Sequence, residues 1–122
     1  MKYETLISLL RETGFPFAYD HFAEGESPAP PFICFLFPGS NNFSADGKVF
    51  LKATEVRVEL YTDEKNPEIE EAVEAVFDRY EIYYDKSEVW IDEERLYEVM
   101  YSFEIPWTND PDGSEMEETD AE

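Results

Sequence analysis

The sequence predicts an α+β domain in which two helices pack on an antiparallel or mixed sheet of about four to five strands. Two observations carry this prediction. Residues 56–61 alternate between apolar and polar side chains, which is typical of a strand with one buried face. Residues 67–80 carry apolar side chains at helical spacing, which predicts an amphipathic helix lying on such a sheet. A chain of 122 residues is the usual size of one domain.

The chain is expected to begin with a helix over residues 2–12. Gly14 is placed to cap its C-terminal end. A short strand should follow over 17–22, with His21 on the parity that is expected to be buried, and residues 23–31 should form a loop rich in proline. The apolar positions that share one face of the helix are Tyr3, Leu6, Ile7 and Leu10.

Residues 32–37 are apolar at every position, so both faces of this strand should be covered. The cover is either a helix of this chain or a neighbouring subunit. We expect this strand and residues 48–61 to form an antiparallel hairpin. The apolar parity of the second strand changes near 52–54. Either a β-bulge causes this change, or the strand leaves the sheet there and another chain covers it.

The hairpin loop, residues 38–47, is longer than most connections in small domains. Loops of this length are more often binding elements than filler. Phe43, near its tip, either folds back onto the sheet or contacts a partner. The candidate partner-binding residues of the loop are Asn41, Asn42, Phe43 and Asp46.

The helix over 67–80 has clear end signals. Asn66 is a suitable N-cap, Pro67 is a suitable first residue, and glutamates occupy the positive end of the helix dipole. These acids lack the spacing and the central glycine of an EF-hand, so they indicate a solvated face instead of a calcium site. The expected buried stripe consists of Ile69, Ala72, Val73, Val76, Phe77 and Tyr80.

The last structured part should contain a short strand or pair of strands over 82–91 and a second clear strand over 96–105. Residues 106–122 form an acidic tail that cannot bury enough apolar area to fold, so the domain is expected to span 1–105 and the tail to be disordered. The expected anchors of the 82–91 segment are Tyr83, Tyr84, Val89, Trp90 and Ile91.

The formal net charge is −21. The tail contributes seven of the 30 acids and none of the nine bases, so the folded part is strongly acidic in its own right. Because phosphate backbones and anionic membranes attract bases, the charge argues against direct binding to nucleic acid or to a membrane. It favours basic partner surfaces, or serves solubility alone. The chain has no apolar run of bilayer length and no signal-peptide pattern, so a cytosolic protein is expected.

Residue types that commonly act as nucleophiles or bases in catalysis, such as cysteine and histidine, are scarce. The single cysteine, Cys34, lies in an apolar run and is expected to be buried, and the single histidine, His21, has no nucleophile beside it in sequence. No metal-ligand spacing and no phosphate-binding loop is present. With 30 acids, neighbouring carboxylates are expected by chance. We therefore expect no enzyme activity, no cofactor and no metal site.

Three segments resemble a family of small proteins of tailed phages and prophages of Gram-positive bacteria. They are PPFICFLFPGSNNFSADGKVF, EVRVELYTDEKNPEIEEAVEAVF and EVWIDEERLYEVMYSFEI. The family is similar to tail-completion or tail-terminator proteins, which act in head–tail joining, and the resemblance covers about residues 1–105.

The resemblance implies an α+β subunit that forms a homo-oligomeric ring, typically sixfold, at the head-proximal end of the tail. The ring would stop growth of the tail tube and dock onto the head connector, with the 38–47 loop contacting a neighbour or the tube. It also implies a place in the virion, and in the host cytoplasm during assembly. The rival hypothesis is an acidic DNA mimic that inhibits a host DNA-binding protein. A small enzyme with a carboxylate site is a third, weaker hypothesis.

Overall fold

The computed structural model describes residues 3–40, 43–45 and 48–108, and gives side chains for 3–40 and 53–105. The fold is α+β, as the sequence predicts. The elements in chain order are α1 (Tyr3–Glu12), β1 (Phe17–Tyr19), β2 (Phe32–Leu36), β3 (Phe43–Ala45), β4 (Lys48–Thr62), α2 (Pro67–Arg79), β5 (Asp85–Ile91) and β6 (Leu96–Thr108).

The strands form one mixed sheet in the order β1-β2-β4-β6-β5, and β3 pairs with the first part of β4. β1 is parallel to β2, and every other pair is antiparallel. The predicted hairpin of β2 and β4 is confirmed and lies next to the centre of the sheet. Its connection contains the short strand β3. The edge strands of this order are therefore β1 on one side and β5 on the other.

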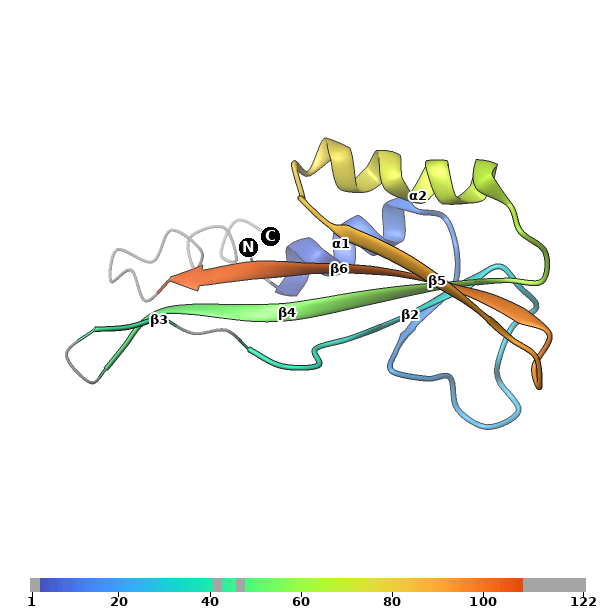
Figure 1. Ribbon diagram of the computed structural model, residues 1–122, viewed down its shortest axis with the longest axis horizontal. Coiled ribbons are helices and arrows are strands. Elements are labelled where there is room, and N and C mark those ends of the chain that lie inside the picture. Colours follow the sequence, from blue (N-terminus) through green and yellow to red (C-terminus); the bar gives the residue numbers. More distant parts are fainter. Residues whose placement is uncertain (1–2, 41–42, 46–47, 109–122) are drawn as a thin grey trace.

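Both helices lie on the same side of the sheet, and the paired strands β4 and β6 extend beyond them together with β3 as an arm (Figure 1). The core lies between the sheet and the helices, where side chains of alternating strand residues meet the helix stripes. Its buried members are Leu6, Leu9, Leu10, Ile33, Phe35, Val56, Val58, Leu60, Val73, Val76, Phe77, Val99, Tyr101, Phe103 and Ile105.

We call the opposite side of the sheet the helix-free face, because neither α1 nor α2 covers it. The loop between β1 and β2 lies on this side (Figure 1). There the ring of Phe22 packs edge-on against Phe32 at 5.5 Å, and Tyr61 stacks on Phe32 at 5.1 Å. Both faces of β2 are thus covered within this chain, which decides between the two expected kinds of cover. No neighbouring subunit is needed to bury Phe32 or Cys34.

Helix α1 agrees with the predicted bounds to within one residue. Leu6, Leu9 and Leu10 are fully buried, whereas Tyr3, which was expected in the stripe, is half exposed. The helix ends where Gly14 adopts a φ of +82°, a conformation that glycine accepts without steric cost.

Helix α2 is also confirmed. The amide of Ile69 donates a hydrogen bond to Oδ1 of Asn66 at 3.2 Å, so Asn66 is the N-cap. Two side chains depart from the predicted stripe: Ala72 is exposed, and Glu70 is buried. Glu70 tolerates burial because two lysines reach it, as described below.

The predicted strand over 17–22 is too long. β1 ends at Tyr19 because Asp20 has a φ of +64°, which turns the chain out of the extended conformation. The prediction that His21 occupies a buried parity is wrong for the same reason. Its side chain is 77% exposed, and Nδ1 lies 3.0 Å from Oδ2 of Asp20.

The β-bulge expected near 52–54 is also wrong, as is the alternative that the strand leaves the sheet there. The pairing of β4 with β6 keeps one register from Leu51 to Thr62. The irregularity lies instead between β3 and β4, at Phe43 and Ser44. Since the alternation of β4 is unbroken over that span, Ala53 and Val56 lie on opposite faces and both are buried. The apolar residues therefore shift from one face of β4 to the other because a different face of the strand is buried on each side of this point.

The last two strands differ from their predicted bounds at one end each. β5 begins only at Asp85, and Tyr83, an expected anchor, is 85% exposed. β6 continues beyond Ile105 to Thr108, because the backbone of β4 still offers partners as far as Leu51. Neither described helix is long and apolar enough to cross a membrane.

Candidate assembly surfaces

The first exposed apolar surface lies at the β1 edge of the sheet. Phe37, just after β2, packs edge-on against Tyr3 of α1, with ring centroids 6.3 Å apart, and against Tyr19 of β1 at 5.4 Å. The amide of Phe37 also donates to the hydroxyl of Tyr19 at 3.2 Å. Tyr3 is 49% exposed and Tyr19 is 47% exposed. We call these three residues the β1-edge cluster.

The second exposed apolar surface lies at the opposite edge, and we call its members, Tyr83, Val89 and Trp90, the β5-edge patch. Val89 and Trp90 are adjacent in β5, so their side chains point to opposite faces of the sheet. The Trp90 ring packs against Tyr97 at 4.8 Å, and its Nε1 donates to Asp92 at 3.2 Å. The large exposed apolar side chains of the described residues thus lie at or near the two opposite edges of one sheet, as a packed cluster near β1 and as separate side chains along β5.

A pair of carboxyl groups, from buried Glu59 and partly buried Glu98, lies on the helix-free face. The Tyr61 hydroxyl lies 3.0 Å from Oε1 of Glu59 and 3.2 Å from Oε2 of Glu98. Nε of Arg57 donates to the other oxygen of Glu59 at 3.1 Å. The residue Glu59 is only 7% exposed. The hydroxyl has one proton to donate, so the two carboxylates compete for it.

The surroundings of Glu59 favour its protonated form. Burial raises the pKa of Glu59 to about 7, and the hydrogen bond and negative charge of Glu98 act in the same direction. Donation from Tyr61 and the charge of Arg57 oppose them without reversing the effect. At neutral pH Glu59 is therefore only partly ionised. Sequence reasoning missed this pair, because Glu59 stands at the polar parity of an alternating strand and nothing in the pattern marks it as buried.

A hollow of about 240 Å³ lies near this pair, below the loop between β1 and β2. It is lined by Asp20, His21, Phe22, Ser27, Phe32, Cys34, Tyr61 and Glu94. Burial raises the pKa of the Cys34 thiol to about 11, with smaller effects from nearby acids, so the thiol stays protonated and is a poor nucleophile at neutral pH. Among the residues with described side chains, no group of three or more His, Cys, Asp or Glu could hold a metal ion.

An ion network joins α2 to β5 on the helix side. Glu70 lies 2.8 Å from Nζ of Lys65 and 2.9 Å from Nζ of Lys86. Lys86 also reaches Glu74 at 2.6 Å, and Glu74 accepts a hydrogen bond from the Tyr101 hydroxyl at 2.8 Å. Every member has a partner inside the domain, so the network holds the helix to the sheet.

The predicted site residues are only partly placed. Asn41, Asn42 and Asp46 lie outside the described residues. Phe43 is the first residue of β3, and its backbone pairs with Leu51, but its side chain is outside the described part. Its two expected roles, core or contact, therefore both remain open. The exposed aromatic residues of the two edges were not among the predicted site residues.

No protein-family model matches the chain, and no curated protein matches it either.

Proposed function

We propose that this chain is a structural subunit of phage tail assembly, a tail-terminator or tail-completion protein that forms a ring at the head–tail junction. The resemblance of its sequence segments to that family motivates the proposal. The observation that carries it is the location of the exposed apolar side chains in two different sets near opposite edges of one sheet.

Two unlike surfaces on opposite sides suit head-to-tail contact between identical subunits. A contact of this kind closes into a ring when the rotation between neighbours is right, whereas a self-complementary patch gives a dimer. Aromatic residues are enriched at such interfaces because they bury a large area with few rotatable bonds. In the proposed ring, the β1-edge cluster of one subunit meets the β5-edge patch of the next.

The test uses one charged substitution at each edge. Tyr3→Glu disables the β1-edge cluster and Tyr83→Glu disables the β5-edge patch, while both sites are exposed enough to keep the fold. Ala72→Glu, on the exposed side of α2, is the matched control. Masses are measured by size exclusion with light scattering, alone and with a phage tail-tube protein.

The expected result is a ring for the wild-type protein and the control, and monomers for each edge variant. A mixture of the two edge variants should give a heterodimer, because each retains the edge that the other lacks. Equal masses for all proteins, or edge variants that do not combine when mixed, would refute head-to-tail assembly.

The alternative function is inhibition of a host DNA-binding protein by mimicry of DNA, which the net charge of −21 supports. The burial that raises the pKa of Glu59 to about 7 counts against this alternative, since it lowers the negative charge of the helix-free face near neutral pH. A stable monomer in the assay above, together with salt-sensitive binding to a basic nuclease or repressor, would favour the mimic over the ring.

A further inference from the structure

The loop between β1 and β2, residues 20–31, covers part of the helix-free face (Figure 1). The middle of this loop is held lightly. The Phe22 ring is half-buried against Phe32, whereas residues 23–27 are exposed, and the backbone hydrogen bond that Glu26 donates stays within the loop. Lifting the middle of the loop therefore breaks fewer interactions than separating two strands, whose backbones are hydrogen-bonded along their length.

The hollow of about 240 Å³ beneath this loop borders the surroundings of Glu59. Two of its lining residues are neighbours of Glu59 in the sheet. Cys34 is the register partner of Glu59 in β2, and the Tyr61 hydroxyl lies 3.0 Å from Oε1 of Glu59. The loop supplies other parts of the lining, among them Asp20 and Phe22. Water that enters beneath the loop would meet Tyr61 and, next to it, Oε1 of Glu59.

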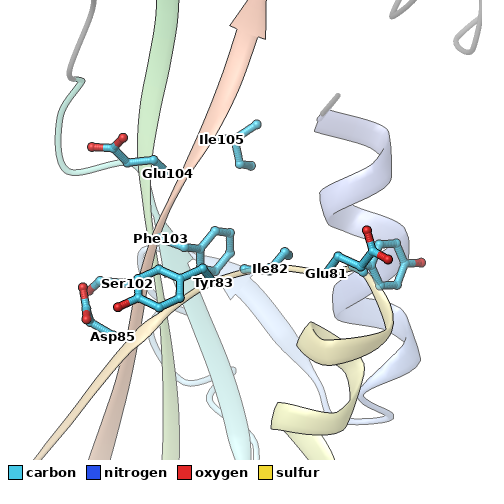
Figure 2. A pocket seen from close by; sticks show the side chains of 9 residues that line it. Glu81, Ile82, Tyr83, Asp85, Ser102, Phe103, Glu104 and Ile105 are labelled. Carbon is cyan, nitrogen blue, oxygen red and sulfur yellow. The ribbon is translucent and has the colours of Figure 1, made fainter.

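Two larger hollows do not offer the same access. The first, of about 470 Å³, is lined by the connection between α2 and β5 and by β6, with Ile82 and Phe103 among its side chains (Figure 2). Its lining includes neither Glu59 nor Tyr61. The second, of about 340 Å³, borders Arg57, but Nε of Arg57 already donates to Oε2 of Glu59 at 3.1 Å. The oxygen that needs a further donor is Oε1, on the side of Tyr61.

Loss of a proton from Glu59 leaves Oε1 short of hydrogen-bond donors. Burial and the hydrogen bond with Glu98 both favour the protonated form of Glu59. Once ionised, Glu59 competes with Glu98 for the one proton of the Tyr61 hydroxyl. A buried carboxylate that lacks donors gains free energy when water reaches it. The charged and titratable groups around Glu59 and the hollow are Arg57, Tyr61, Glu98, Cys34, Asp20, His21 and Glu94.

We propose that the loop between β1 and β2 is a pH-controlled cover of the helix-free face, closed while Glu59 holds a proton and opening increasingly as Glu59 ionises. Opening lets water reach Oε1 and exposes Cys34 together with the stacked rings of Phe32 and Tyr61. Burial under the closed loop raises the pKa of Glu59 from 4.5 to about 7, and a hydrated carboxyl group returns toward 4.5. The ratio of open to closed molecules therefore rises by up to about 300-fold from acid to alkaline pH. The proposal is independent of ring formation.

The thiol of Cys34, which is 5% exposed, is the probe of opening. Its rate of reaction with iodoacetamide is measured from pH 5.5 to pH 8.5 with and without Glu59→Gln. Both proteins also carry His21→Gln, because histidine commonly titrates in this range. The ratio of the rate with Glu59 to the rate with Glu59→Gln removes the thiol's own response to pH, and it should rise at least about tenfold. Besides burial, the charge of Glu59 raises the pKa of this thiol, which by itself would lower the ratio, so a rise reports opening.

Two further variants separate opening of the loop from unfolding of the domain. Val73→Cys in a Cys34→Ser chain places a thiol at a fully buried site of α2. At pH 8.5 Cys34 should react at least about tenfold faster than this control thiol, because the loop opens locally. Glu98→Gln removes the competing carboxylate, so the rise in the rate ratio should level off at a lower pH.

Three results would overturn the proposal. A rate ratio that stays flat or falls would mean that Glu59 titrates beneath a closed loop. Equal rates for Cys34 and the control thiol would mean that both wait for unfolding of the whole domain. An unchanged profile in Glu98→Gln would detach the opening from this pair of carboxyl groups.

Discussion

At the scale of one residue, the buried carboxyl group of Glu59 makes the stability of the fold depend on pH. In the folded protein its pKa is raised from 4.5 to about 7, so the fold binds a proton that the unfolded chain releases more easily. The contribution of Glu59 to stability is therefore complete below about pH 4.5. It is lost as the pH rises through about 7, because the fold must then hold a buried charge.

We expect Glu59→Gln to remove this loss, since an amide fills the site without ionising. Between pH 5 and pH 8 the wild-type free energy of unfolding should fall by about 2–3 kcal/mol more than that of the variant. Urea denaturation at several pH values measures the difference. Glu55→Gln, at an exposed position of the same strand, is the control and should keep the wild-type profile. Parallel profiles for the wild type and Glu59→Gln would show that Glu59 titrates normally.

Thr62 illustrates a different residue-scale effect. It is 2% exposed, and within the described part of the chain its Oγ1 has no hydrogen-bond partner. A buried hydroxyl without a partner costs free energy, so Thr62→Val should raise the free energy of unfolding by about 1 kcal/mol.

Thr13→Val is the informative comparison. The Thr13 hydroxyl donates to the Leu10 carbonyl at 2.6 Å, so the same substitution there should destabilise. Denaturant titration that moves both variants in the same direction would contradict this assignment.

At the scale of elements, α2 is attached to the sheet both by its apolar stripe and by charge. Glu70 is 2% exposed. Burial alone would raise the pKa of Glu70, but hydrogen bonds and charge from Lys65 and Lys86 outweigh it and leave the pKa lowered. A carboxylate with this balance stabilises the fold above its ordinary pKa. The stabilisation is lost as the pH falls through the lowered value.

Removing Glu70 should leave Lys86 near the Tyr101 ring with only Glu74 as a partner. We expect Glu70→Ala to lower the free energy of unfolding by about 2 kcal/mol at pH 7, less than for a fully buried ion pair because both lysines remain partly exposed. Glu71→Ala, one position along on the exposed side of the helix, should change it by less than about 0.5 kcal/mol. Similar losses for the two variants, measured by thermal unfolding, would mean that α2 is held by its apolar stripe alone.

At the scale of the whole molecule, the core of the described part spans nearly the whole predicted domain. Among the residues with described side chains, the buried cluster runs from Leu6 to Ile105. A chain that ends at Thr108 should therefore unfold cooperatively, with a Tm within about 5 °C of the full-length protein. Scanning calorimetry of the two lengths measures this. Loss of the cooperative transition on truncation would show that the tail belongs to the folded unit.

The sequence by itself determined the class of the fold and most of its elements. The periodicity of residues 67–80 and the cap signal at Asn66 specified α2, and strict alternation specified the pairing segment of β4, because both depend on local geometry. It also specified that this apolar strand is covered on both faces, which holds for residues 32–35.

Only the tertiary structure decided what depends on neighbours distant in sequence. It decided that the loop carrying Phe22 covers the far side of β2, and that Glu59 and Glu70 are buried at positions that read as solvated. It also decided that exposed aromatic residues lie near both edges of the sheet and that β6 continues beyond its pairing with β5. The physical reason is that periodicity records which face of an element is apolar, whereas burial and pairing depend on what the rest of the chain places against that face.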